Sequence, residues 1–358
     1  MEKAGIITGV ITSGVLSAVL SLIFLNFTHK STIFNNLKDR DFKEKEIPRI
    51  GGIAIAISLL ISLLFIRIIF PEILKEADEN INYNWLIVAV FIIFGLGIYD
   101  DLKGANAPKK FFFQIIAAVV IFLGGFKIAE FSIPFIGGKT LGINFLSFLL
   151  TIIWVVGITN AVNIIDGLDG LAVGISFFAA LSLGVLALLS SQYLIALFIA
   201  VLLGSMIGFY PFNFPRAKIY LGDSGSLVIG FILAALAMTT THRKISLAVA
   251  LMIPLMILFL PILETSVTII RRIYRRQNIF KADRDHLHYR FLKKGFSETK
   301  TTLVLISISF LFSLSGILFE FVNRRLRLLL FVAIFFICFF LLNYLGYINI
   351  NSIRGKKK

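Results

Sequence analysis

Long runs of apolar residues recur from one end of this 358-residue chain to the other, and they restrict the fold more than any other feature of the sequence. A helix of roughly 20 apolar residues is long enough to cross the hydrocarbon core of a bilayer. Hydrophobic residues make up 58% of the chain and charged residues only 15%, whereas a soluble protein is about one quarter charged. The sequence therefore predicts an all-α, polytopic integral membrane protein.

Turn and charge signals divide the apolar sequence into about eleven transmembrane helices, with ten as the alternative count. We find no internal repeat and no long polar domain, so we predict one integral membrane domain over residues 1–358. The predicted spans are Gly5–Phe27, Ile50–Phe70, Trp85–Ile98, Phe111–Gly125, Leu141–Thr159, Leu171–Leu189, Leu194–Phe212, Ser226–Thr241, Ile245–Ile270, Thr301–Phe321 and Leu328–Leu345.

The basic residues are divided unequally between the two faces of this topology. The face with the loops after the odd-numbered spans and the C-terminal tail carries 25 of the 35 Lys and Arg residues, and the other face carries nine. Because cytoplasmic loops are enriched in Lys and Arg, we expect the C-terminus in the cytoplasm and the N-terminus outside. The net charge of +15 is explained by basic residues that anchor the chain at the cytoplasmic face and bind anionic lipid or phosphorylated substrates, so it does not require nucleic acid as a partner. The single cysteine, Cys338, excludes an intrachain disulfide.

Four polar clusters lie at the ends of apolar helices. Acidic residues are energetically costly beside a membrane span, so these clusters are candidates for a functional site. All four fall on the predicted cytoplasmic face, which suits a site that meets a soluble substrate from the cytoplasm and a lipid from the membrane. They are Tyr99-Asp100-Asp101 after the third span, Asn160 to Gly170 after the fifth, Tyr220 to Gly225 after the seventh, and Asp283 to His288 after the ninth.

The carboxylates in these clusters are candidate metal ligands. Asp100 and Asp101 are adjacent and repel one another unless a cation lies between them or one keeps its proton, so they can bind Mg²⁺ or activate a phosphate. For such a pair alone, a solvated helix end is the commoner explanation. Asp223, between two glycines before the eighth span, is either a helix N-cap or a metal ligand.

The second cluster is richer than a turn requires. Asn160, Asn163, Asp166 and Asp169 recur every three residues with glycines between them, so they present side-chain acceptors beside free backbone N–H groups. Tyr220 offers either a flat face for a nucleobase or an interfacial belt tyrosine.

The predicted cytoplasmic loop from Arg271 to Lys300 holds ten of the basic residues and two histidines. The arginines at 271, 272, 275 and 276 are typical topology anchors. Four residues of this loop can instead act on a substrate: Arg284, His286, His288 and Arg290. Together they can neutralise a diphosphate, and a histidine can donate or accept a proton near neutral pH. Together the clusters predict a magnesium site beside a phosphate-binding surface, and no Gly-Lys-Ser or Gly-Lys-Thr loop supports ATP hydrolysis of the P-loop kind.

In this order and spacing, the clusters resemble the polyprenyl-phosphate N-acetylhexosamine-1-phosphate transferase family, which includes the initiating enzymes of common-antigen, O-antigen and teichoic acid linkage synthesis. The phospho-MurNAc-pentapeptide translocase of peptidoglycan synthesis is also a member. The resemblance covers nearly the whole chain. Its motifs are Ile47 to Gly52, Asp100-Asp101, Asn160 to Leu171, Asn213 to Gly225 and Ala282 to Arg290.

The resemblance implies that a bacterial cytoplasmic-membrane enzyme uses Mg²⁺ or Mn²⁺ to convert a UDP-N-acetylhexosamine and undecaprenyl phosphate into polyprenyl-diphosphate-sugar and UMP. It also suggests a homodimer. By motif, it implies Asp223 as the principal metal ligand, with Asp100 and Asp101 assisting the metal and activating the lipid phosphate, and His286 and His288 at the donor phosphates and sugar. The implied substrate-binding residues are Lys45 (with Lys43 as a competitor), Asn160, Asn163, Asp166, Asp169, Asn213, Tyr220, Arg284 and Arg290.

Two departures bear on the donor. The triple histidine of the translocase is absent, and the run Asp285 to Arg290 is closer to the GlcNAc-1-phosphate branch. In the other direction, Glu264 stands where that branch more often has Asp. We therefore expect GlcNAc-1-phosphate transfer, with the translocase as the alternative. A polyprenyl-lipid transporter is the remote alternative, against which the one-sided acidic clusters and the lack of a repeat stand.

Overall fold

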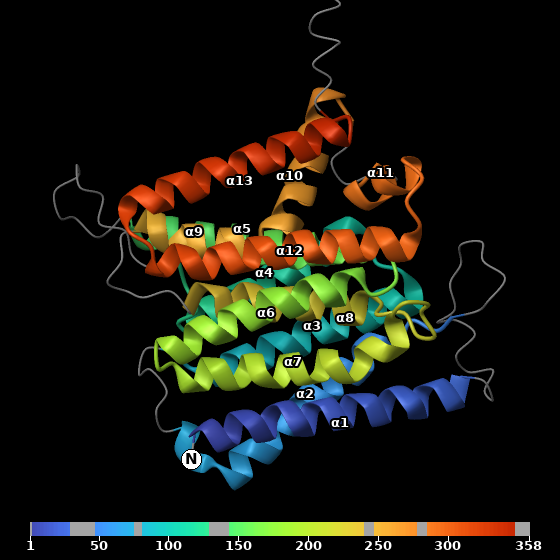
Figure 1. Cartoon of the computed structure of the whole chain (residues 1–358). Helices are drawn as coiled ribbons and strands as arrows, with labels where there is room; N and C mark the ends of the chain where they lie inside the picture. The colour runs from blue at the N-terminus through green and yellow to red at the C-terminus, as the bar shows by residue number, and fades with distance from the viewer. Residues whose placement is uncertain are drawn as a thin grey trace, which may run out of the picture.

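The computed structural model describes residues 2–28, 47–74, 81–128, 143–239, 247–277 and 285–347 (Figure 1). This part of the chain contains helices and no strand, which confirms the predicted all-α class. In chain order the elements are α1 (Glu2–Thr28), α2 (Gly51–Ile69), the 3₁₀ turn η2 (Pro71–Leu74), α3 (Tyr83–Lys103), α4 (Ala107–Leu123), α5 (Ile143–Ile165), α6 (Leu171–Leu189), α7 (Tyr193–Asn213), α8 (Asp223–Thr239), α9 (Leu247–Ile257), α10 (Phe259–Tyr274), α11 (Leu287–Lys293), α12 (Glu298–Phe321) and α13 (Arg324–Tyr344).

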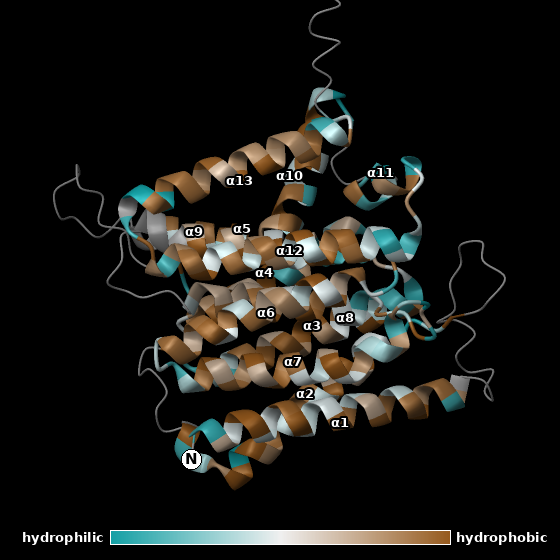
Figure 2. Cartoon of the chain, viewed as in Figure 1, coloured by the Kyte–Doolittle hydropathy of each residue, from teal (hydrophilic) through white to brown (hydrophobic). Residues whose placement is uncertain are grey.

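Within the described residues, 8 helices are long and apolar enough to cross a membrane: α1, α2, α3, α5, α6, α7, α12 and α13. Two further predicted spans form α4 and α8, each of 17 residues. Most helices in Figure 1 run side by side, and Figure 2 shows apolar colour along them, with polar residues gathered at their ends. The chain is therefore a polytopic membrane protein.

The predicted ninth span is not one helix. It divides at Leu258 into α9 and α10, and α10 stands across the direction of the bundle in Figure 1. Pro261 has no N–H to bond the carbonyl of Ile257, which weakens the helix at this point. One face of α10 carries buried polar residues at helical spacing, including Glu264, Thr268 and Arg271.

The described residues of the predicted basic loop, 271–300, are largely helical. They include the end of α10, the short helix α11 and the start of α12.

Close helix contacts at glycine hold the bundle together. A Cβ atom on Gly204 of α7 would lie 2.1 Å from Ser13 Oγ of α1, and one on Gly208 would lie 2.1 Å from the carbonyl oxygen of Gly14. Small residues let membrane helices approach closely enough for van der Waals packing, which is the main attraction available in lipid. At the centre of the bundle, every residue of α8 from Ser224 to Ala237 is buried.

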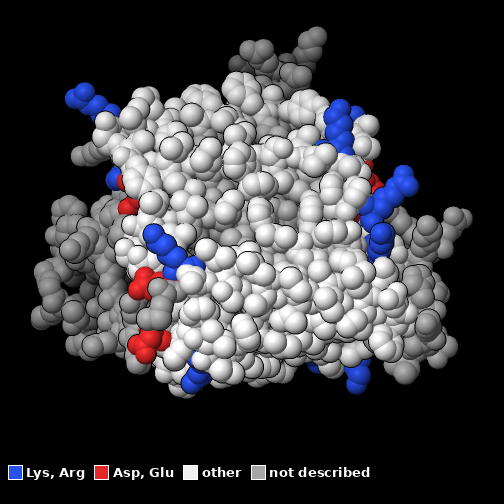
Figure 3. Space-filling model, turned by 60° about the horizontal axis from the view of Figure 1, so that its bottom comes forward, with Lys and Arg blue, Asp and Glu red and all other residues white. Residues whose placement is uncertain are grey.

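Charged side chains gather at the two ends of the molecule. On the face in Figure 3, a broad band without Lys, Arg, Asp or Glu separates charged residues at either end. The loops after α3, α5 and α7 and the start of α11 lie at the same end of the bundle, on the right of Figure 1. The described parts of the four polar clusters are thus brought to one end, as predicted; which side of a membrane this end faces stays a prediction.

Candidate active site

The end of α3 and the beginning of α8 are joined by Asp101. Its two carboxylate oxygens accept hydrogen bonds from the backbone N–H groups of Asp223 (2.8 Å) and Ser224 (2.9 Å). The first N–H groups of a helix have no partner inside the helix, so this contact satisfies two of them. The approach requires glycine at position 222, where φ is +72° and a Cβ atom would lie 2.8 Å from Asp101 Oδ2. Asp101 therefore fixes the position of Asp223.

A lysine lies between the other two carboxylates of the site. The Lys110 ammonium contacts Oδ2 of both Asp100 and Asp223, at 2.5 Å for Asp223. The other oxygen of Asp100 accepts the Ala105 N–H at 2.5 Å. In the sequence, Lys110 is only one of the 25 Lys and Arg residues on the predicted cytoplasmic face, and it was not among the candidate site residues. Its place one turn into the helix that follows the Asp-Asp pair was the available signal.

This arrangement fits a divalent cation. Two carboxylate oxygens from different helices converge on one positive charge, and Mg²⁺ commonly takes one or two protein carboxylates plus water and substrate phosphates. Among the described residues, no group of three His, Cys, Asp or Glu side chains forms a complete metal cage. Asp100 and Asp223 would hold the ion, and Asp101 already gives both oxygens to α8.

The end of α5 brings the Asn-rich run to the same place. Asn163 donates to Ser226 Oγ of α8 at 2.9 Å. Asn160 donates to Gln114 Oε1 of α4 at 2.6 Å. Gln114 is fully buried and was missed from the sequence, although a lone amide within an apolar span is a signal for a polar contact.

Asp166 follows α5 in the turn that leads to α6. Burial, together with the negative charges of Asp223 and Asp101, raises the pKa of Asp166 to about 8. A carboxyl group with this pKa is largely protonated at neutral pH, so it can donate one hydrogen bond and accept another. Asp166 therefore lies within electrostatic reach of the Asp101–Asp223 pair.

Asp169 and Asn213 bind the loops of the site to one another. Asp169 Oδ2 accepts the Ala217 N–H at 2.8 Å. Asn213 is buried, accepts the Gly170 N–H at 3.1 Å and donates to the Ile219 carbonyl at 3.0 Å. These contacts position the 166–170 and 214–222 loops, and the substrate contacts of both side chains stay a prediction.

The segment from Pro48 to Gly52, which leads into α2 and forms its first two residues, lies against the loop after α7. The Tyr220 N–H donates to the Pro48 carbonyl at 2.9 Å, and the Tyr220 carbonyl accepts a hydrogen bond from the Gly51 N–H at 3.0 Å. The Tyr220 side chain is partly exposed at this junction. A Cβ atom on Gly52 would lie 2.0 Å from the backbone nitrogen of Gly225, so glycine is required where α2 meets α8.

The His-Leu-His segment reaches the Asn-rich run through His288. This side chain is 1% exposed, neither ring nitrogen has a hydrogen-bond partner, and a Cβ atom on Gly167 would lie 2.4 Å from its Nε2. The ring stacks on His286, with centroids 5.7 Å apart. Burial, and secondarily the charge of His286, lowers the pKa of His288 to about 3, so it is neutral at physiological pH.

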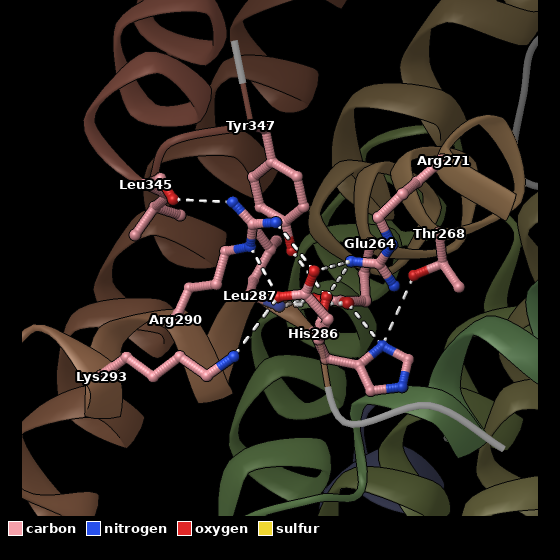
Figure 4. A network of polar contacts seen from close by, with 10 residues as sticks. Glu264, Thr268, Arg271, His286, Leu287, Arg290, Lys293, Leu345 and Tyr347 are labelled. Carbon is pink, nitrogen blue, oxygen red and sulfur yellow. Dashed lines mark hydrogen bonds and ion pairs between the residues drawn. The ribbon is translucent and has the colours of Figure 1, made fainter. Parts of the chain in front are cut away.

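His286 is held by Glu264 of α10, a residue of the predicted ninth span. Its Nδ1 lies 2.9 Å from Glu264 Oε1, and Glu264 also accepts the Leu287 N–H at 2.9 Å (Figure 4). A carboxylate can only accept, so Nδ1 carries the proton and Nε2 is left for another partner.

Arg290 is engaged by Asp285, through bonds of 2.9 and 2.8 Å. Its predicted role at a phosphate therefore stays a prediction. Lys45 and Arg284, together with the competitor Lys43, lie outside the described residues.

Comparison with known proteins gives relatives along most of the chain. The family model described as glycosyl transferase family 4 matches residues 83–241. The chain is 34% identical over 301 residues to the probable undecaprenyl-phosphate N-acetylglucosaminyl 1-phosphate transferase of Bacillus subtilis (strain 168), covering 84% of this chain and 80% of that protein. It is 33% identical over 287 residues to the decaprenyl-phosphate N-acetylglucosaminephosphotransferase of Mycobacterium leprae (strain TN), covering 75% and 72%.

A further relative is a pentapeptide transferase, the enzyme named as the alternative in the sequence analysis. The chain is 28% identical over 346 residues to the phospho-N-acetylmuramoyl-pentapeptide-transferase of Oceanobacillus iheyensis, covering 89% of this chain and 99% of that protein. The family match includes the described carboxylates of α3, the 166–170 loop and α8. From this match and the identity to transferases over most of their length, the chain belongs to glycosyl transferase family 4 and is a sugar-phosphate transferase.

Proposed function

We propose that the protein transfers N-acetylglucosamine 1-phosphate from UDP-GlcNAc to undecaprenyl phosphate, with Mg²⁺ as cofactor, and releases UMP. The observation that carries the proposal is the Asp100–Lys110–Asp223 centre, which lies at one end of a membrane bundle. The names of two relatives, which combine a polyprenyl phosphate with N-acetylglucosamine phosphate, support this choice. We further propose that this end faces the cytoplasm of a bacterial cell and that the reaction starts a cell-envelope polysaccharide.

The chemistry exchanges one phosphorus–oxygen bond for another. An oxygen of the lipid phosphate attacks the β-phosphorus of the donor, and the bond from that phosphorus to the bridging oxygen breaks as UMP departs. Asp100 and Asp223 would hold a Mg²⁺ ion, and its positive charge would offset the charge that develops on the departing UMP. The Lys110 ammonium, which contacts the Asp100 and Asp223 carboxylates, would add a second positive charge at this centre.

The surrounding residues hold this centre in place. Asp101 anchors the start of α8, so Asp223 keeps a fixed position relative to Asp100. Asn163 binds Ser226 in the first turn of α8. Asp166, in the loop between α5 and α6, offers its carboxyl group to a polar ligand such as the uridine end of the nucleotide. Neutral His288 packs His286 against the 166–170 loop.

The donor separates this function from that of the pentapeptide transferase. Purified protein in detergent is offered undecaprenyl phosphate and Mg²⁺ with either UDP-GlcNAc or UDP-MurNAc-pentapeptide, and UMP is measured. We expect release with UDP-GlcNAc and none with the pentapeptide donor. Release only with UDP-MurNAc-pentapeptide would overturn the proposed donor and assign the protein to peptidoglycan synthesis.

A further inference from the structure

The turn that follows the last membrane helix contacts the histidine segment of the site. Tyr347 lies three residues beyond α13, and its hydroxyl donates to the backbone carbonyl of Asp285 at 3.0 Å (Figure 4). Asp285 directly precedes His286. A residue near the C-terminal end of the described chain therefore contacts the backbone beside a candidate catalytic side chain that is 61 positions earlier in sequence.

The same turn holds Arg290 in two further ways. The guanidinium carbon of Arg290 lies 3.5 Å from the centroid of the Tyr347 ring, and its NH1 donates to the Leu345 carbonyl at 2.9 Å. Arg290 in turn binds the Asp285 carboxylate through Nε and NH2. Cation–π contact and paired charge-assisted hydrogen bonds both fix the plane of a guanidinium group.

Asp285 is thus held from three elements. Arg271 of α10 contacts both its carboxylate, at 3.0 Å, and its backbone carbonyl; Arg290 of α11 binds the carboxylate; Tyr347 binds the carbonyl. These arginines overcome the effect of burial and hold the pKa of Asp285 below its ordinary value. Burial raises the pKa of Tyr347, so its hydroxyl remains a donor at neutral pH.

The helix that carries this turn has little other attachment. Only 6% of the membrane-spanning window of α13 is buried, against 44% in α12. The polar contacts of Leu345 and Tyr347 therefore add to the few apolar contacts of this part of the chain, made by the buried Ile334, Cys338 and Leu345, and they join it to the end of the bundle that holds the site.

We propose that Tyr347 is a positioning residue for His286, acting through Asp285 and Arg290, so that the turn after α13 sets the geometry of the donor-binding segment. This inference rests on the proposed function for its kinetic consequence alone. Glu264 fixes the His286 ring from α10, and Tyr347 fixes the backbone on the other side of the same residue. Loss of Tyr347 leaves the ring contact but removes one of the two side-chain donors, Tyr347 and Arg271, that hold the backbone carbonyl beside His286.

The test uses the full-length protein with Tyr347→Phe and Tyr347→Ala. The matched control is Tyr344→Ala, because Tyr344 is more than half exposed, lies one turn earlier, and its ring contacts only the Lys294 ammonium among the described contacts. Hydrogen–deuterium exchange of peptides covering 285–293 reports the clamp without any need for activity. We expect faster exchange there in both Tyr347 variants and no change in the control.

The kinetic readout is the KM for each substrate. Loss of one hydrogen bond predicts that Tyr347→Phe raises the KM for UDP-GlcNAc about fivefold, and loss of the ring in Tyr347→Ala predicts about 20-fold. The KM for undecaprenyl phosphate should stay at the wild-type value in both variants. Because Tyr347→Phe keeps the ring, it should be the milder of the two and should keep the wild-type melting temperature.

Two results would overturn the inference: wild-type exchange at 285–293 in Tyr347→Ala, or, in Tyr347→Phe, a rise in both KM values together with a lower melting temperature. Failure of the proposed function is distinguishable, because wild-type protein would then release no UMP while the exchange comparison still decides whether the clamp exists.

Discussion

Adjacent carboxylates at the end of α3 make different contacts. Asp100 faces the Lys110 ammonium, whereas Asp101 gives both of its oxygens to the backbone of α8. In the sequence both were candidate metal ligands, because adjacency alone does not show which side chain meets a neighbouring helix. The structure favours Asp100 and Asp223 as the pair that meets a cation and Asp101 as the group that positions Asp223.

Asp223→Asn tests this division at the level of one atom. The substitution keeps the size of the side chain and removes its charge, so we expect turnover to fall by about 100-fold or more. Donor binding, measured by equilibrium titration of UDP-GlcNAc, should change by only a few fold. Turnover near the wild-type value in this variant would contradict the assignment of Asp223 to the metal.

Lys110→Gln tests whether the ammonium and a metal share the same oxygens. Because like charges repel at close range, removal of the ammonium should strengthen Mn²⁺ binding by about tenfold, while turnover falls. Electron paramagnetic resonance of free Mn²⁺ gives the affinity. Lys109→Gln is the control, since Lys109 contacts Tyr99 and neither carboxylate of the centre. Weaker Mn²⁺ binding in Lys110→Gln would show that the lysine does not compete for this site.

At the scale of elements, hydropathy was enough to find the long apolar helices, since each predicted span contains a described helix, but it did not find the short α11 in the predicted loop. It did not find the division of the ninth span, because Ile245–Ile270 is apolar on both sides of Leu258 and the break depends on Pro261. The partners of Lys110 and Glu264 could not be predicted from the sequence either. Their contacts depend on which helices pack together, and the local sequence pattern does not show this packing.

Glycines where α2 and α3 meet α8 are predicted to be indispensable. Gly52→Ala would place a Cβ atom 2.0 Å from the backbone of Gly225, which no flexible side chain can relieve. We expect the variant to lose its monodisperse peak in size-exclusion chromatography or to melt at a clearly lower temperature.

Gly95→Ala is the matched control, because a Cβ atom there meets nothing within 4 Å. A glycine in a helix interior costs about 0.5–1 kcal/mol relative to alanine, so this variant should be as stable as the wild type or slightly more so. Equal stability of the two alanine variants would contradict the close approach of α2 and α8.

At the scale of the whole molecule, the bundle gathers the carboxylates, amides and histidines of the candidate site at one end and leaves an uncharged band along the face in Figure 3. The distribution of Lys and Arg predicts that this end is cytoplasmic. Ser191 lies in the turn before α7 and Lys218 in the loop after it, so cysteines at these positions report opposite ends of one helix.

Labelling with a membrane-impermeant maleimide measures this orientation in right-side-out vesicles. In a Cys338→Ser background, we expect Ser191→Cys to be labelled in intact vesicles and Lys218→Cys only after permeabilisation. The reverse pattern would place the site outside the cell and contradict the cytoplasmic assignment.

The central claim is that the enzyme moves a sugar together with its phosphate. The most direct measurement identifies the nucleotide that purified wild-type protein releases from UDP-GlcNAc in the presence of undecaprenyl phosphate and Mg²⁺, with mass spectrometry of the lipid product. We predict UMP and undecaprenyl-diphosphate-GlcNAc in equal amounts, both lost on chelation of the metal. Release of UDP with a lipid monophosphate-linked sugar would show transfer of the sugar alone and contradict the account.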